Sequence, residues 1–293
     1  MIKILITGAN SFVGKNFISN SHYMHISEVD LIHNKPEDIN FSKVDVVLHL
    51  AAIVHQSQKI PDSEYFKINR DLAVQVAEKA KKEGVKHFIF LSSVKVYGEY
   101  NPKKGVWSEN APCEPYDAYG KSKYEAEIKL KKLESPDFVI SIIRPPLVYG
   151  VGVKANMLSI IKLVDRLPVL PFKKVNNKRS FTAVENLVEL IDIVIEKKAS
   201  GIFLPMDENP LSTSELVDII ARSLNKRVWL FHLPKILVFT GKMIVPGIFD
   251  RLYGSFEIDN SHTRNVLGYN PAISAKEAIQ KMVEDYKETK QYK

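Results

Sequence analysis

The sequence is poor in several features, and each absence excludes a class of protein. Its 293 residues contain a single cysteine, Cys113, so an intrachain disulfide is impossible and we expect a reducing, cytoplasmic compartment. No group of His and Cys residues has the spacing of a metal site, so we predict no metal. There is no low-complexity tract, and a composition of 45% apolar and 26% charged residues is typical of a soluble globular protein.

Long apolar runs are also lacking. The most apolar stretch, residues 236–245, contains Gly241 and Lys242 and stops at Pro246, so it is too short to span a bilayer. We predict a packed helix there, with shallow membrane contact as the alternative. The chain opens on a strand-like run without the charged region and cleavage site of a secretion signal. The net charge of +7 suits an anionic small molecule, and its scatter argues against nucleic acid.

The first 150 residues alternate short apolar runs with helical stretches. We predict strands at residues 2–6, 28–33, 44–50, 86–91 and 138–143, and helices at 63–83 and after Asp117. This alternation is typical of right-handed βαβ units. The predicted fold class is therefore α/β, a Rossmann-type doubly wound parallel sheet.

After residue 150 the pattern changes. Helices are predicted at residues 156–166, 185–197, 212–224 and 275–287, with a strand at 202–204. Ser212 and Glu215 have the spacing of a capping box at the start of one of these helices. We predict a dinucleotide-binding domain at residues 1–150, to which 180–204 return, and a smaller, interleaved C-terminal substrate lobe at 151–179 and 205–293.

A glycine-containing turn follows the first strand. Gly8 allows a tight turn, and Gly14 lets the next helix approach the strand closely. The middle position of such turns is commonly glycine and is Ser11 here, which is small enough to let backbone approach a ligand. Because a helix N-terminus favours a pyrophosphate, we predict cofactor contacts from Gly8, Asn10, Ser11, Phe12, Val13 and Gly14.

The end of the second strand decides which cofactor fits. Dinucleotide folds place an acidic residue there to hold the adenosine ribose. With the strand predicted at 28–33, the tip carries His33, Asn34 and Lys35 and no carboxylate, which favours tolerance of a ribose 2′-phosphate. Residues 36–39 leave almost no room for a further helix and strand, so we expect one side of the sheet to be lean.

Tyr119 and Lys123 stand four residues apart, so on a helix they share one face. A phenol has an ordinary pKa of about 10, and a neighbouring ammonium lowers that pKa toward the working range. Ser92 and Ser93 follow the strand at 86–91, at the edge where ligands bind in parallel sheets. Taken alone, the Tyr–Lys spacing also fits an ordinary solvated helix.

Together these motifs resemble the extended short-chain dehydrogenase/reductase family, the NAD-dependent epimerases and dehydratases. The matching positions, over essentially the whole chain, are Thr7-Gly8 through Gly14, Asp38-Ile39, Leu50-Ala51-Ala52, Asn69, Ser92-Ser93 before Val96-Tyr97-Gly98, Tyr119 to Lys123, Arg144-Pro145 and Arg179.

Further segments are similar to the reductases of UDP-2-acetamido-2,6-dideoxy-4-keto-hexoses. They are residues 144–150, 152–156, 177–180, 211–215, 254–259 and 263–268. Those enzymes make UDP-N-acetylquinovosamine or UDP-N-acetylfucosamine for bacterial surface polysaccharides such as the lipopolysaccharide O-antigen and capsule.

The resemblance implies an NAD(P)H cofactor, a UDP-sugar substrate and a role for each residue. Tyr119 would protonate the substrate's 4-oxygen, Lys123 would hold the nicotinamide ribose and lower the pKa of Tyr119, and Ser93 would orient the carbonyl. Ser92 is the alternative to Ser93, or a ribose neighbour. Further expected cofactor contacts are His33, Asp38, Ile39, Leu50, Ala51, Ala52, Asn69 and Pro146. Expected substrate contacts are Lys95, Asn156 and Arg179, with Arg179 on the diphosphate, and the family favours a homodimer.

Three functions remain open from the sequence. The first is reduction of a 4-keto UDP-sugar with a released cofactor, and the second is 4-epimerisation of a UDP-sugar with tightly bound NAD. The missing ribose carboxylate favours release. The third is a non-catalytic nucleotide-binding regulator. Of the histidines, His55, just beyond Ala52, is the one to test as an acid or base.

Overall fold

The computed structural model describes residues 1–54, 60–98 and 105–291, so His55 lies outside the described chain. Six parallel strands form the central sheet in the order β10-β6-β4-β3-β1-β2. Their bounds are β1 Ile4–Thr7, β2 Ile26–Val29, β3 Val46–His49, β4 His87–Leu91, β6 Val139–Ile143 and β10 Gly201–Phe203. The predicted parallel sheet is confirmed.

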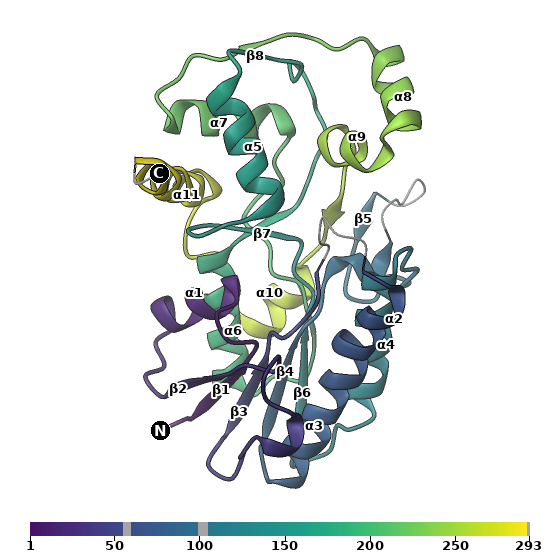
Figure 1. The fold of residues 1–293 in the computed structure, drawn as a ribbon, viewed down its shortest axis with the longest axis vertical. Helices are drawn as coiled ribbons and strands as arrows, with labels where there is room; N and C mark the ends of the chain where they lie inside the picture. The colour runs from purple at the N-terminus through teal and green to yellow at the C-terminus, as the bar shows by residue number, and fades with distance from the viewer. Residues whose placement is uncertain (55–59, 99–104, 292–293) are drawn as a thin grey trace.

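Helices cover both faces of this sheet (Figure 1). One face packs against α1 (Phe12–Asn20), α6 (Val184–Lys197) and α10 (Ser261–Leu267). The other packs against α3 (Ala73–Lys82) and α4 (Ala118–Lys131). Because both faces are covered, the inner strands read as continuous apolar runs, whereas the edge strand β2 carries exposed Ser27 and Glu28. The doubly wound prediction is confirmed.

The second strand ends earlier than predicted. β2 stops at Val29, and residues 31–33 form a turn, so the predicted strand at 28–33 is wrong at both ends. Between β2 and β3 the described chain forms one short 3₁₀ turn, η1 (Pro36–Asp38). The expectation of a lean edge is confirmed, because β2 is the last strand of the sheet on that side.

The helix predicted at 63–83 is continuous but not uniform. It begins as α2 (Asp62–Tyr65), widens into a π-helical segment, η2 (Phe66–Leu72), and continues as α3 to Lys82. The residue Gly84, with φ +88°, follows its end. Wide turns of this kind occur often at functional sites, and Asn69 lies inside this one.

The second half builds a smaller cluster around α5 (Ala155–Arg166), α7 (Thr213–Ser223) and α11 (Ala275–Gln291). The predicted capping box of Ser212 and Glu215 is present at the start of α7. Three short parallel strand pairs complete the fold. They are β7 (Leu147–Tyr149) with β9 (Phe181–Ala183), β8 (Val169–Leu170) with β11 (Trp229–Leu230), and β5 (Val106–Trp107) with β12 (Glu257–Ile258). β10 returns to the main sheet, and the domain boundaries at 150, 179 and 204 stay a prediction.

The apolar stretch at 236–245 forms α8 (Lys235–Ile244), followed by α9 (Pro246–Tyr253). None of the ten residues of α8, all of them described, is buried, so the prediction of a packed helix is wrong. Among the described residues, no helix is long and apolar enough to cross a membrane.

Candidate active site

The turn after β1 leaves no space for side chains. Gly8 has φ +98°, and a Cβ there would lie 2.6 Å from the backbone nitrogen of Ala51 at the end of β3. Ser11 caps α1, its Oγ accepting from the N–H of Gly14 at 3.1 Å. Phe12 and Val13 pack into the core, so they contribute backbone only. Free N–H groups at a helix start favour an anion, and the turn therefore fits a dinucleotide pyrophosphate.

A carboxylate missed by the sequence analysis stands at the tip of β2. Asp30 follows the last residue of the strand, its Oδ1 accepting from the Ile32 N–H at 2.8 Å and its Oδ2 lying 2.6 Å from His33 Nδ1. These two hydrogen bonds, the backbone one first, lower the pKa of Asp30. An ionised carboxylate here is placed to hold ribose hydroxyls. The prediction that the tip lacks one is wrong, and His33 is the exposed partner of Asp30.

Other predicted cofactor residues fall into two groups. Leu50 and Ala51, buried, and Ala52, half-buried, follow β3 beside the glycine turn, and Asp38 is exposed in η1. Ile39 is buried in the core cluster that contains Leu5, so its side chain faces away from solvent. Leu50 and Ala51 adjoin Gly8, so they lie where a ligand bound at the turn could contact them.

Asn69 is fully buried and acts on the backbone. Its Nδ2 donates to the Ile53 oxygen at 3.0 Å, and its Oδ1 accepts from the Ile53 N–H at 2.8 Å. The same Nδ2 donates to Ser122 Oγ at 3.1 Å. Asn69 thus ties the chain after β3 to α4, and its geometry supports a positioning role rather than the expected direct contact.

The start of α4 is fixed by a cap and by a close backbone contact. Asp117 is the N-cap, and its Oδ1 accepts from the Gly120 N–H at 2.7 Å. A Cβ on Gly120 would lie 2.6 Å from the carbonyl oxygen of Lys95. Lys95 belongs to a short 3₁₀ turn, η3 (Val94–Tyr97), that follows Ser93. The glycine inside the Tyr–Lys motif therefore lets α4 approach this turn.

Tyr119 and Ser93 are joined at this contact. They share a hydrogen bond, which lowers the pKa of Tyr119, but burial outweighs it and raises that pKa to about 12. The Tyr65 ring meets the Tyr119 ring edge-on, with 6.5 Å between centroids. The structure thus places Tyr119 and Ser93 in hydrogen-bond contact, as their predicted roles require.

Lys123 is buried one turn further along α4. Its Nζ donates to the Leu91 oxygen at 2.8 Å and lies 4.5 Å from the centroid of the Phe90 ring. Burial lowers the pKa of Lys123 to about 7, against the charge of Glu127, which raises it. The predicted lowering of the Tyr119 pKa by Lys123 is wrong for this structure, because the ammonium faces the end of β4.

Beneath these residues lies a buried network that the sequence analysis did not identify. Glu127, one turn after Lys123, accepts from Arg144 Nη2 at 2.5 Å and from its Nε at 3.0 Å. Ser92 Oγ donates to the same carboxylate, and Arg144 Nη1 donates to the Tyr97 hydroxyl at 2.8 Å. Since its hydroxyl is engaged by Glu127, Ser92 is not placed for the expected ribose contact. The four-residue spacing of Tyr119, Lys123 and Glu127 was the available signal.

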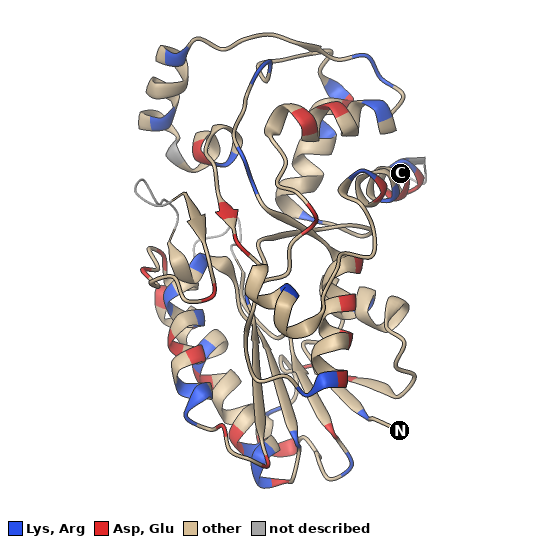
Figure 2. Cartoon of the chain, turned by 180° about the vertical axis from the view of Figure 1, so that it is seen from behind, with Lys and Arg blue, Asp and Glu red and all other residues tan. Residues whose placement is uncertain are grey.

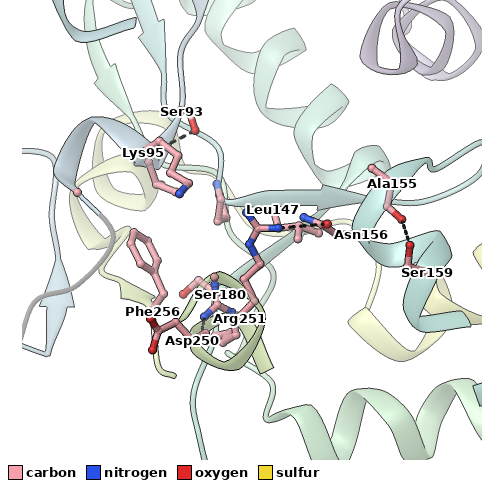
Figure 3. A pocket seen from close by; sticks show the side chains of 15 residues that line it. Ser93, Lys95, Leu147, Ala155, Asn156, Ser159, Ser180, Asp250, Arg251 and Phe256 are labelled. Carbon is pink, nitrogen blue, oxygen red and sulfur yellow. Dashed lines mark hydrogen bonds between the residues drawn. The ribbon is translucent and has the colours of Figure 1, made fainter. Parts of the chain in front are cut away.

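A cavity of about 590 Å³ opens beside Ser93. Four of the five predicted substrate contacts line it, namely Ser93, Lys95, Asn156 and Arg179, and so does Pro146, which was predicted to contact the cofactor. Figure 3 shows Lys95 and Arg251 extending toward this space from different elements. Tyr119 is not among the described residues that line the cavity, but it shares a hydrogen bond with Ser93, which does line it.

Three cations border the cavity. Lys95 Nζ lies 3.7 Å from Asp117 Oδ2, and Arg251 Nη1 lies 3.5 Å from Asn156 Oδ1. Arg179 Nη1 donates to the carbonyls of Asp250 and Gly254 at 3.2 and 3.1 Å. Arg251, from α9, was missed because no motif marks it. This charge suits a diphosphate, and among the described residues no cluster of potential metal ligands is present.

Two curated relatives cover most of the chain. A UDP-glucose 4-epimerase of Vibrio cholerae is 36% identical over 311 residues, covering 97% of this chain and 95% of the relative. The N-acetyl-alpha-D-glucosaminyl-diphospho-ditrans,octacis-undecaprenol 4-epimerase of Escherichia coli O157:H7 is 30% identical over 254 residues, covering 79% of this chain and 75% of the relative.

Solved structures share the fold at lower identity. The UDP-glucuronic acid 4-epimerase of Bacillus cereus in complex with NAD superposes with a TM-score of 0.76 at 20% identity, covering 98% of this chain and 99% of that one. RMD of Pseudomonas aeruginosa complexed with NADPH gives a TM-score of 0.79 at 16% identity, covering 99% and 100%.

The family model described as the NAD dependent epimerase/dehydratase family matches residues 4–203. This span includes the glycine turn, Asp30, Ser93, Tyr119 and Lys123. The chain belongs to the NAD dependent epimerase/dehydratase family.

Proposed function

We propose that this protein catalyses NAD-dependent oxidoreduction at C4 of a UDP-hexose or UDP-N-acetylhexosamine, with 4-epimerisation as the net reaction. The observation that carries the proposal is the hydrogen-bonded pair of Tyr119 and Ser93 at the edge of a cationic cavity. The names of the two curated relatives share a 4-epimerase activity, and both refer to a sugar on a diphosphate.

The glycine turn and Asp30 would hold the dinucleotide by its pyrophosphate and ribose. The chemistry that NAD supplies when bound is reversible hydride exchange with an oxygen-bearing carbon. Ser93 would hydrogen-bond the substrate's 4-oxygen, and Tyr119 would take and return the proton of that oxygen. With a pKa of about 12, Tyr119 needs a nearby positive charge to act as a base. Lys123 would supply this charge in its protonated form only by turning its ammonium from the Leu91 carbonyl toward Tyr119.

Asp30 favours epimerisation over the reductase function. Release of the cofactor was expected because the β2 tip was predicted to lack a carboxylate, but Asp30 stands there. A carboxylate on the ribose supports retention of NAD through the reaction, which an epimerase needs. The same carboxylate would also repel a phosphate on the 2′-oxygen of the adenosine ribose, so Asp30 favours NAD over NADP.

The second candidate is reduction of a UDP-2-acetamido-2,6-dideoxy-hexos-4-ulose by NAD(P)H. The observation that favours it is the single turn η1 between β2 and β3, which agrees with the resemblance to 4-keto-sugar reductases. Both candidates use the same Tyr119, Lys123 and Ser93.

One experiment separates the candidates. Purified protein is incubated with UDP-N-acetylglucosamine or UDP-glucose without added cofactor, and the products are separated by anion-exchange chromatography. The epimerase proposal predicts the C4 epimer, and Tyr119→Phe abolishes it. Stoichiometric loss of NAD(P)H absorbance with a UDP-4-keto-6-deoxy sugar, and no epimer, establishes the reductase instead. Unchanged biological activity of Tyr119→Phe supports the regulator.

A further inference from the structure

The helical hairpin of α8 and α9 projects from the substrate lobe (Figure 1) and is held from one side only. A Cβ on Gly241 would lie 2.2 Å from the Phe249 ring, so that ring packs directly on the α8 backbone. Phe249 stacks on Tyr253 with 5.5 Å between ring centroids, and the Tyr253 hydroxyl donates to the Pro171 oxygen at 2.8 Å. α9 is therefore anchored in the lobe, and α8 is held chiefly by α9.

The apolar face of α8 points away from the protein. The exposed fractions are 70% for Ile236, 64% for Phe239, 71% for Met243 and 79% for Ile244. At ~100° per residue these side chains span roughly 140° of the helix, while Gly241 lies on the packed side. An ordinary surface helix turns its apolar stripe toward the core. The apolar side chains of α8 face solvent instead. A contiguous exposed apolar surface of this kind marks an interaction site.

Basic residues predominate in the segment that contains this face, although Lys226 pairs with Asp165 at 2.5 Å and Arg251 borders the cavity. Between residues 226 and 253 there are five Lys or Arg residues and one acidic residue, Asp250, whose Oδ1 lies 3.1 Å from Lys242 Nζ. The Lys173 N–H donates to the Phe231 oxygen at 3.1 Å, which brings the exposed Lys173 beside the segment that enters α8. Figure 2 shows only Lys and Arg colouring on α8 itself.

We propose that this face of α8 docks on the surface of an anionic lipid bilayer. A helix with exposed Phe, Leu and Ile and flanking lysines has the composition of an interfacial membrane helix. A second copy of the chain fits less well, because a stable protein–protein interface uses about 20–30 residues a side and two basic hairpins repel one another. The proposal does not depend on the reaction at C4.

The test measures co-sedimentation of the whole protein with vesicles of phosphatidylglycerol and phosphatidylcholine, and with vesicles of phosphatidylcholine alone. The double variant Phe239→Glu/Met243→Glu is compared with Met24→Glu/Val266→Glu, which adds the same charge at exposed apolar positions elsewhere. Circular dichroism and NAD binding verify that both variants fold.

Wild type and the Met24/Val266 variant are expected to bind the anionic vesicles, with weaker binding to neutral ones. The Phe239/Met243 variant should bind at least about tenfold more weakly, and Lys235→Ala about fivefold more weakly. Equal binding of the two double variants, or no binding of wild type, overturns the proposal. So does a halving of molecular mass in light scattering on Phe239→Glu/Met243→Glu alone, because the face is then an interface between copies.

Discussion

Helices α4 and α8 place their side chains in opposite ways. α4 carries Lys123 and Glu127 in its buried face, although its sequence is rich in charge. α8 is mostly apolar, and none of its described residues is buried. The difference teaches that a helix is buried where it finds polar partners as well as apolar ones. Lys123 of α4 donates to the Leu91 carbonyl at the end of β4, and Glu127 of α4 pairs with Arg144. α8, in contrast, packs chiefly on the Phe249 ring of α9.

The largest effect is expected on catalysis. Tyr119→Phe removes the proton-transfer group and should lower turnover by about 10²- to 10⁴-fold. NAD binding, measured by isothermal titration calorimetry, should stay within about twofold, because the turn and Asp30 are untouched. A fall in NAD affinity as large as the fall in turnover would place Tyr119 in binding instead.

The next effect concerns the charge buried under α4. Arg144→Leu leaves the buried Glu127 carboxylate with the Ser92 hydroxyl but without its ion-pair partner, and should lower the free energy of unfolding by about 3–5 kcal/mol in urea denaturation. The double variant Arg144→Leu/Glu127→Leu should recover a large part of this loss. If the double variant is as unstable as the sum of both single variants, the two side chains do not act as a pair.

Gly120→Ala probes the close approach of α4 to η3. Its Cβ would lie 2.6 Å from the Lys95 carbonyl, so α4 must shift at a cost of about 1–3 kcal/mol. Turnover should fall with little change in NAD affinity, because the Tyr119–Ser93 bond is at this contact. Gly247→Ala, with no atom within 4 Å of the added Cβ, is the control for stability alone, because Gly247 itself lines the cavity.

The buried Lys123 makes stability depend on pH. Its pKa is lowered from 10.5 to about 7 in the folded protein, so between these pH values the unfolded chain binds more protons. Stability relative to Lys123→Met should therefore rise by up to ~1.4 kcal/mol per pH unit above pH ~7. Urea denaturation of both proteins at several pH values measures this. A difference independent of pH would show that the ammonium is hydrated.

The smallest effect is expected on α8. Phe239→Ser changes only an exposed position, so its free energy of unfolding should stay within about 0.5 kcal/mol of wild type. A loss of about 2 kcal/mol or more in thermal denaturation, roughly four times what surface changes give, would show that the helix is buried as α4 is.

Local sequence patterns predicted the parts of the fold that depend on local rules. Gly8 and Gly14 mark a turn whose backbone excludes side chains, and Ser212 with Glu215 marks a helix start. Tyr119 and Lys123 share a helix by spacing alone. These features depend on residues close together in the chain, so the sequence carries the whole signal.

The features that were predicted wrongly or missed depend on contacts between residues far apart in the sequence. β2 ends at Val29 because the pairing of β1 ends at Thr7, which the residues after Val29 do not reveal. That error concealed Asp30. Arg251 reaches the cavity from α9, and Glu127 meets Arg144 across α4 and β6, so neither has a local motif.

The most direct test of the central claim follows the hydrogen at C4. UDP-N-acetylglucosamine or UDP-glucose carrying deuterium at C4 is incubated with the protein, and the C4 epimer is analysed by mass spectrometry and NMR. The account predicts that the epimer retains the deuterium at C4, because it leaves and returns as hydride. Loss of the deuterium to solvent, or no epimer from either sugar, would contradict it.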